Sequence, residues 1–255
     1  MLLLLATLAY AFPVGTHLTY EVNVDFDGIL PVLQRLRNAT ASVAMTVDVV
    51  GVAPENEGGN PRVVSEIKAL KLVFNGAAMN FGPENVSEYF PKATIECTPF
   101  GKQVKTDAPN TQLPIRLPGL DVKRFPDITY LPIEFPADGI EEGKPFKFKK
   151  PFGDGPVEYE VTPTKITADS VSLTIELSQI YSIYEDARRR PTDAASAETK
   201  VTTDVEGSGT GTFDRKRNLV TEYQIEATAT GKAVSLKDQT KSERKLKTTL
   251  KVVLK

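Results

Sequence analysis

Long stretches of the sequence alternate apolar and polar residues at every second position. Most of them lie in the C-terminal half, at residues 157–161, 171–183, 201–213, 219–229 and 246–254. Residues 42–52 show the same pattern. Successive side chains of a β-strand point to opposite faces, so this period is typical of half-buried antiparallel strands. The sequence therefore predicts a chain built mainly from long strands.

The length of 255 residues suffices for a sizeable core, because a chain of this size buries on the order of 70% of its unfolded surface. We predict an all-β fold with long antiparallel strands in one or two strongly curved sheets, as an open barrel or a sandwich-like arrangement. One or two short helices are expected. Residues 29–37 place Leu30, Leu33 and Leu36 three apart, and residues 83–90 begin at the proline of a Gly-Pro pair.

The chain divides into four predicted segments. These are a signal peptide (1–11), an N-terminal β module (12–108), a proline-rich strap (109–145) and a C-terminal antiparallel β module (146–255). Seven of the 18 prolines fall in the strap, which excludes a continuous helix or a central strand there. Because apolar residues are interleaved with these prolines, we expect the strap to lie against the body of the protein.

The first residues have the pattern of an export signal. Leu2 to Ala11 carry no charge and end in the small-x-small sequence Ala9-Tyr10-Ala11. Such a stretch is typical of a secretory signal peptide, and it is shorter than the roughly 20 residues of a membrane span. We predict cleavage after Ala11, a mature chain without a transmembrane segment, and a secreted or periplasmic location. The alternative is a buried first strand.

Three glycines at alternate positions are the most informative local feature. Gly207, Gly209 and Gly211 should face the same way, so part of the inward surface of their strand lacks side chains. Glycine inside a strand usually marks a bend, a bulge or the close approach of a neighbour. One interpretation is strong curvature of the sheet. The other is a concave pocket for an apolar ligand, which Tyr223 and Ala227 would complete.

The hairpin that contains these glycines has a predicted register. If Phe213 pairs with Leu219, Gly209 lies opposite Tyr223. Large side chains of the second strand would then lean over the positions that have none.

Three short motifs run along the mature chain. They are Gly-x-x-Leu-x-Tyr, a mid-chain Leu-Pro…Pro…Gly-x-x-aromatic stretch and a Gly-x-x-x-Phe-Asp turn. Their residues are Gly15, Leu18 and Tyr20, then Leu131, Pro132, Pro136, Gly143 and Phe146, then Gly209, Phe213 and Asp214. With them the chain resembles a family of bacterial exported β-rich proteins of unassigned function. At the level of the fold it also resembles the curved-sheet carriers of envelope lipids and lipoproteins.

The residues that catalytic and metal sites require are scarce. With one His and one Cys, the chain cannot form a Cys-rich zinc site, an iron–sulfur cluster or an internal disulfide. His17 is expected to be exposed, and Cys97 to be buried and inert. No phosphate loop, nucleophile elbow or dinucleotide fingerprint occurs, so we predict no catalytic residue, metal ligand or cofactor. The net charge of −2 argues against a nucleic-acid partner.

Three functions remain open. The first is a non-enzymatic extracytoplasmic binding module that holds an apolar small molecule or a lipid in a concave sheet face. The second is a structural or protein-interaction β protein of the bacterial envelope, whose partner would be an envelope protein. The third is a carboxylate-dependent hydrolase, whose two acids, about 5–10 Å apart, no sequence pattern would reveal.

Overall fold

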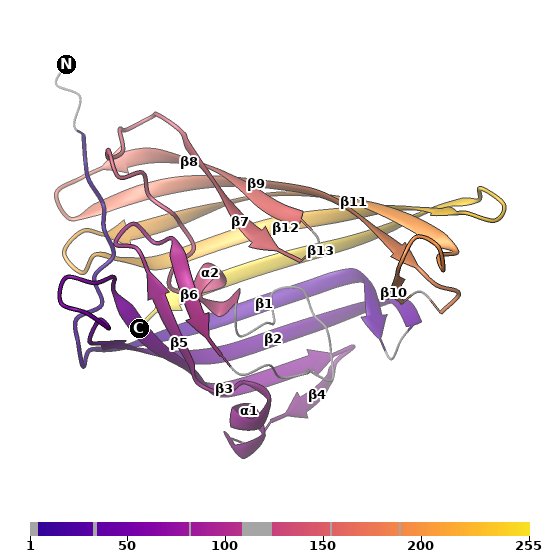
Figure 1. The fold of residues 1–255 in the computed structure, drawn as a ribbon, viewed down its shortest axis with the longest axis horizontal. Helices are drawn as coiled ribbons and strands as arrows, with labels where there is room; N and C mark the ends of the chain where they lie inside the picture. Colours follow the sequence, from indigo (N-terminus) through magenta and orange to yellow (C-terminus); the bar gives the residue numbers. More distant parts are fainter. Residues whose placement is uncertain (1–4, 33–34, 82, 109–123, 154, 189) are drawn as a thin grey trace.

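The computed structural model describes residues 5–32, 35–81, 83–108, 124–153, 155–188 and 190–255 (Figure 1). Its strands are β1 (His17–Val32), β2 (Arg35–Val52), β3 (Arg62–Phe74), β4 (Ala77–Asn80), β5 (Ala93–Cys97), β6 (Gln103–Asp107), β7 (Phe146–Phe152), β8 (Gly155–Ile166), β9 (Ser170–Glu185), β10 (Pro191–Thr192), β11 (Thr199–Asp214), β12 (Leu219–Ser235) and β13 (Lys241–Leu254). Two short helices, α1 (Pro83–Tyr89) and α2 (Phe125–Ile128), accompany them. The prediction of an all-β fold is confirmed.

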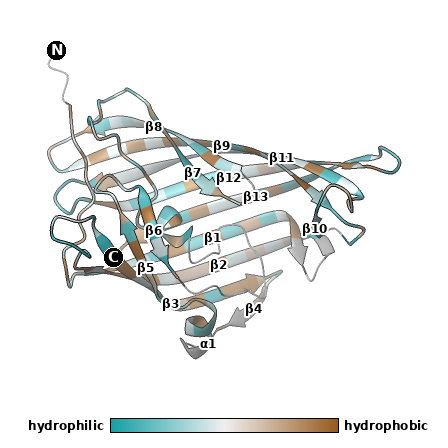
Figure 2. Ribbon diagram, viewed as in Figure 1, coloured by the Kyte–Doolittle hydropathy of each residue, from teal (hydrophilic) through white to brown (hydrophobic). Residues whose placement is uncertain are grey.

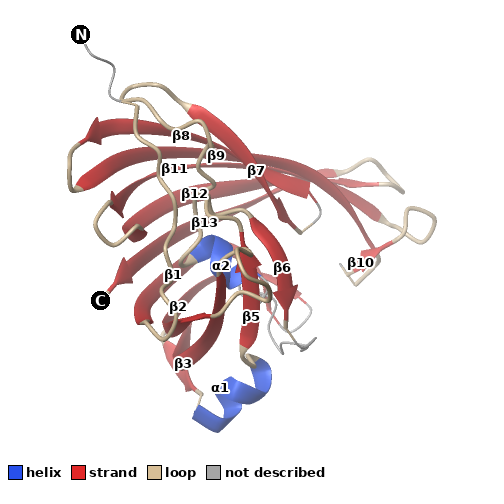
Figure 3. Ribbon diagram, turned by 60° about the vertical axis from the view of Figure 1, so that its left-hand side comes forward, coloured by secondary structure: helices blue, strands red, loops and turns tan. Residues whose placement is uncertain are grey.

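All of these strands belong to one antiparallel sheet. Hydrogen-bonded neighbours follow the order β6-β5-β3-β2-β1-β13-β12-β11-β9-β8-β7, with β4 beside β3 and β10 beside β9. β1 pairs with β13, so strands from both predicted β modules share the sheet. The sheet curves strongly but does not close into a barrel, because β6 and β7 form its two edges (Figure 1, Figure 3).

Alternating side chains give the sheet one apolar face and one polar face. On β1, Tyr20, Val22 and Val24 are at most 6% exposed, whereas Glu21 and Asn23 between them are exposed. The same alternation is visible as bands of hydropathy along the strands in Figure 2. We call the face that carries Tyr20 the inner face, and the opposite one the outer face.

One part of the inner face is covered by α2 and the extended chain that follows it (Figure 3). This described part of the predicted strap, residues 124–145, buries Phe125, Leu131, Ile133 and Phe135 to 4% exposure or less. Burying a side chain of this kind stabilises the fold by about 1.5–3 kcal/mol. Residues 109–123 of the strap lie outside the described residues.

Of the two segments expected to be helical, one is confirmed and one is wrong. α1 begins at Pro83, as the Gly-Pro entry predicts. Residues 29–37 instead form the paired ends of β1 and β2, apart from residues 33–34, which are outside the described chain. Leucines spaced three apart fit a helix, but strand pairing overrides this local preference. In the described part of the chain, neither helix is long and apolar enough to cross a membrane.

β11 lies so close to β12 that some of its glycines leave no room for a side chain, whereas others do. A Cβ atom added to Gly209 would lie 1.9 Å from the carbonyl oxygen of Gln224. At Gly211 the nearest atom would be the Tyr223 Cβ at 3.4 Å, which is an ordinary contact. The missing side chain at Gly209 therefore permits the close approach of a neighbouring backbone.

A bulge between Thr212 and Phe213 sets the register of this hairpin. Phe213 lies opposite Val220 instead of Leu219, which displaces the ladder by one position, and the bulge displaces it by one more. Tyr223 therefore lies opposite Gly211, and the predicted pairing of Tyr223 with Gly209 is wrong. A bulge in one strand shifts every later residue pair of the two strands. No residue type in this stretch predicts the bulge.

We predict that Gly209→Ala destabilises the protein by about 1–3 kcal/mol, because the added methyl group would overlap the Gln224 carbonyl. Gly211→Ala is the matched control on the same strand and face, and should change stability by less than about 1 kcal/mol. Urea denaturation followed by circular dichroism measures both. Equal effects of the two substitutions would contradict the close approach at Gly209.

Candidate functional site

The inner face remains half-buried across five adjacent strands, β8, β9, β11, β12 and β13. Two neighbouring rows of side chains lie there, as the cross-strand pairing shows, and most of them are small or apolar. The exceptions are Gln179, which is buried opposite Val205, and Thr248, which lies opposite Ala227. We call this half-buried set the inner strip: Tyr159, Leu177, Val205, Gly207, Ala227, Ala229 and Leu246. An open, partly exposed apolar surface of this kind can contact an apolar ligand without displacing buried core residues.

The structure places the five predicted site residues on one face but in two environments. Gly207 and Ala227 lie opposite each other within the inner strip. Gly211 and Tyr223 form another pair, in which Tyr223 is 1% exposed and its hydroxyl donates to a backbone carbonyl of α2. Gly209 lies between the two pairs. Of these two pairs, Gly207 with Ala227 is therefore the one that a ligand on the inner strip could contact.

A charged pair limits the inner strip toward the far ends of β9 and β13. Glu185 is eight residues beyond Leu177, and Arg244 is two residues before Leu246, so both face inward. The guanidinium of Arg244 donates two hydrogen bonds to the Glu185 carboxylate, at 2.8 and 2.9 Å. The side chain of Glu185 is only 6% exposed. The apolar surface thus ends at a bidentate ion pair.

A second buried charge, Lys150, limits the strip on the side of the edge strand β7. Its Nζ atom lies 2.8 Å from the Asp127 carboxylate and 2.5 Å from the Leu131 carbonyl oxygen. The side chains of Lys150 and Asp127 are 3% and 11% exposed. Arg124 also approaches Asp127, at 3.5 Å. These contacts hold α2 and the chain after it against β7.

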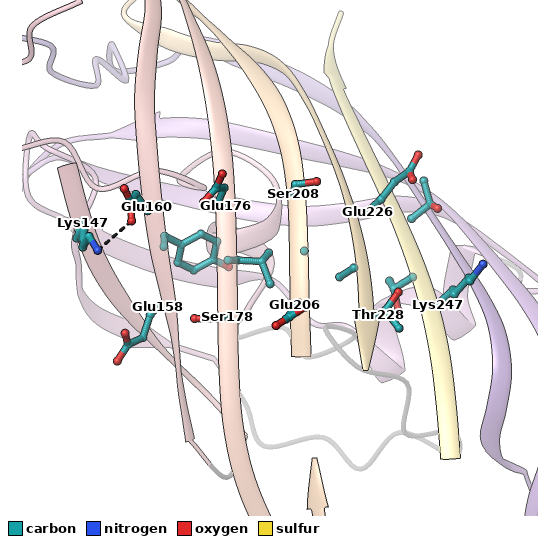
Figure 4. A pocket seen from close by; sticks show the side chains of 16 residues that line it. Lys147, Glu158, Glu160, Glu176, Ser178, Glu206, Ser208, Glu226, Thr228 and Lys247 are labelled. Atoms are coloured by element: carbon teal, nitrogen blue, oxygen red, sulfur yellow. Dashed lines mark ion pairs between the residues drawn. The ribbon is translucent and has the colours of Figure 1, made fainter. Parts of the chain in front are cut away.

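The outer face carries a groove of a different chemistry, with a volume of about 710 Å³. It crosses six strands, β7, β8, β9, β11, β12 and β13, between two rows of polar side chains (Figure 4). Tyr159, Leu177, Gly207 and Ala227, which lie between these rows in the sequence, also line it. One row contains Lys147, Glu160, Glu176, Ser208 and Glu226, and the other Glu158, Ser178, Glu206, Thr228 and Lys247. Carboxylates at this density favour water and cations, so the groove does not suit an apolar ligand.

The Glu158 carboxylate of the groove does not have the properties of a general acid. Lys147 Nζ lies 2.9 Å from the Glu160 carboxylate, and Lys149 pairs with Glu158. The hydrogen bond from Lys149 lowers the pKa of Glu158. A general acid in a glycosidase needs a raised pKa, so this exposed pair gives no support to the hydrolase alternative.

Two singular residues lie away from both surfaces. The side chain of His17 is 67% exposed, and its Nδ1 atom lies 3.2 Å from an Asp48 carboxylate oxygen. Cys97 is buried, as predicted, and burial raises the pKa of its thiol to about 12. In the described residues, no group of three or more His, Cys, Asp or Glu side chains could hold a metal ion.

The inward-facing charges were not predicted from the sequence, although the position of one of them carried a signal. Lys150 occupies an apolar position of the alternation in β7, two residues after Phe148 and two before Phe152. A charge on the apolar side of an alternating strand needs a partner, because an unpaired buried charge is costly. The identity of that partner depends on tertiary contacts.

Comparisons with known proteins provide little more. No family model matches the sequence, and the curated proteins contain no match to it. Among solved structures, DynF from the dynemicin biosynthesis pathway of Micromonospora chersina is similar at 9% identity over 98% of this chain and 84% of that one. The TM-score of 0.22 does not define a shared fold. The chain is thus a β-sheet protein with a buried aromatic cluster.

We predict that Lys150→Met destabilises the protein by about 3–5 kcal/mol, because it leaves the Asp127 carboxylate buried without its main partner. The exposed pair of Lys216 and Asp169 is the control, and Lys216→Met should leave the urea midpoint unchanged. Adding Asp127→Leu to Lys150→Met should restore much of the loss. A destabilisation as small as that of the control would contradict a structural role for the buried pair.

Buried tyrosines should make the protein sensitive to alkali. Burial raises the pKa of Tyr10, Tyr20, Tyr130 and Tyr223 above the ordinary value. Their neutral forms therefore stabilise the folded state fully below about pH 10, and this contribution is lost as the pH rises further. The urea midpoint should fall above about pH 10, and tyrosinate absorbance should rise together with unfolding. Ionisation of all eight tyrosines in the folded protein near their ordinary pKa would contradict this burial.

Proposed function

We propose that this protein is a non-enzymatic binding module outside the cytoplasm, which holds an apolar or lipid-like ligand against the inner strip. The observation that carries the proposal is the half-buried apolar surface around Gly207 and Ala227, on a sheet that does not close. Covering apolar surface is favourable by about 25 cal/mol per Å². A ligand that lies along the strip gains this free energy without any rearrangement of the core.

The limits of the strip favour a ligand of finite length over a broad protein partner. Lys150 with Asp127 and Glu185 with Arg244 bound the strip on two sides. Both pairs satisfy their charges internally, so neither attracts a charged group of the ligand strongly. The proposed ligand is therefore recognised mainly by shape and apolar contact.

Export is part of the proposal. Removal of residues 1–11 by cleavage after Ala11 would place the module in the periplasm or outside the cell, in keeping with the family of exported proteins that the sequence resembles. Nucleic acid is not a proposed partner, because the net charge is −2.

The alternative of an envelope protein that pairs through its sheet edges has weaker support. The edge strand β7 carries Lys147, Lys149 and Pro151. Lysine and proline at an edge discourage the addition of another strand. The opposite edge, β6, is only five residues long, so it offers a short ladder to a partner.

Titration with the fluorescent fatty acid cis-parinaric acid tests the proposal. We expect saturable binding, and a loss of affinity of about tenfold or more in Ala227→Arg, because the new side chain would cover the strip with a charge. Glu226→Arg is the matched control, since it places the same side chain on the outer face one residue away. Equal affinities of the two variants, or no saturable binding to the folded wild-type protein, would refute it.

A further inference from the structure

The N-terminal segment, residues 5–12, lies across one end of the curved sheet (Figure 1, Figure 3). Ala6 exchanges two backbone hydrogen bonds with Ile140, at 2.9 and 2.8 Å. Further along, the amide of Tyr10 donates to the Pro99 carbonyl at 2.7 Å, and that of Ala11 donates to the Asn218 carbonyl at 3.1 Å. The segment is therefore held along its length like a strand.

Alternate side chains of this segment enter the core. Ala6, Leu8 and Tyr10 are each 2–3% exposed, whereas Leu5 is 65% exposed. This in-and-out pattern agrees with the buried first strand that was the alternative interpretation of these residues. The same residues form the apolar part of the predicted signal peptide, so one sequence satisfies both patterns.

Tyr10 lies in a slot whose shape and polarity match a phenol. Its ring contacts Phe135 and Phe213, with centroids 5.6 and 5.8 Å away. A Cβ atom added to Gly101 would come within 2.5 Å of the ring, so Gly101 leaves room for it. The hydroxyl donates a buried hydrogen bond of 3.0 Å to the Ile133 carbonyl oxygen.

Every wall of this slot belongs to the chain that remains after cleavage at Ala11. A signal peptidase acts before the exported chain folds, so the processed protein would form the walls without Tyr10. The aromatic side chains would then line an empty space, and the Ile133 carbonyl would lose its buried donor. Both losses are reversed by a ligand that supplies an aromatic ring and a hydroxyl group.

We propose that, in the processed chain, the slot vacated by Tyr10 binds an apolar ligand that ends in a hydroxylated aromatic ring. The ring lies between Phe135 and Phe213, and its hydroxyl donates to Ile133. The apolar remainder follows the path of Leu8 and Ala6 across the end of the sheet. This inference rests on the proposed function, because it requires export, and it names the chemical class of the ligand.

The experiment compares two forms of the protein whose N-termini are defined by intact mass. One is the chain purified from the periplasm of a bacterial host, expected to begin at Phe12. The other is the full chain from Met1, produced in the cytoplasm. Each is titrated with p-cresol, the side-chain analogue of tyrosine, and with toluene, which lacks the hydroxyl. Thermal shift and ligand-observed NMR measure binding.

We expect saturable p-cresol binding to the processed chain, with toluene weaker by about five- to tenfold, since toluene leaves the Ile133 carbonyl unpaired. The full chain should bind neither compound, because Tyr10 fills the slot. An exported protein that retains Tyr10 overturns the inference, and so does a folded processed chain that does not bind p-cresol.

If the processed chain does not fold, Tyr10→Ala in the full chain decides the matter. Saturable p-cresol binding by this variant supports the slot, and its absence from the folded variant overturns it. Tyr10→Phe is the control, because it keeps the ring and should bind no p-cresol. A protein could bind cis-parinaric acid in a way that Ala227→Arg weakens, and yet bind no p-cresol. That result would overturn this inference but would still support the proposed function.

Discussion

A single sheet has to bury its own apolar face, and this constraint governs the whole structure. In a sandwich, a second sheet would cover the inner side chains. Here β1 to β13 form one layer, so the cover comes from curvature, from α2 with the extended chain after it, and from residues 5–12. Residues 5–12, the chain after α2 and the sheet itself each contribute one aromatic side chain to a cluster, in which Tyr10, Phe135 and Phe213 contact one another. The inner strip is the part of the face that this cover does not reach.

Gly209 and Gly207 of β11 differ in how closely the backbone of β12 approaches them. At Gly209 the absence of a side chain brings in the backbone of β12, and no free space results. At Gly207, a Cβ atom would lie 2.9 Å from the Ala227 Cβ and from the Glu226 carbonyl oxygen, and 3.1 Å from the Leu177 Cδ1, yet the position stays half-buried. Small residues on both strands lower the surface there, so the strip is shallow rather than deep.

Which face of the sheet each side chain of a long strand occupies could be predicted from the sequence. Which strands pair with one another could not. Alternation is a local property, so the inward positions of Tyr20, Gly207 and Tyr223 follow from counting by two. The pairing of β1 with β13 joins residues more than 200 positions apart, and no local pattern encodes it. The helix expected at Leu30 and the register expected for Gly209 were wrong for related reasons, since strand pairing and a bulge are decided by tertiary contacts.

Inward charges define the candidate site more than its apolar residues do. Desolvation offsets most of the attraction within a buried ion pair, so Lys150 with Asp127 adds little net stability over well-packed apolar side chains. The pair instead fixes the position of α2, because a buried Lys150 without a partner would be strongly destabilising. α2 must therefore lie where Asp127 reaches Lys150. Glu185 and Arg244 constrain β9 and β13 in the same way. The apolar surface between these two pairs thus has fixed limits, which hydrophobic packing alone would not impose.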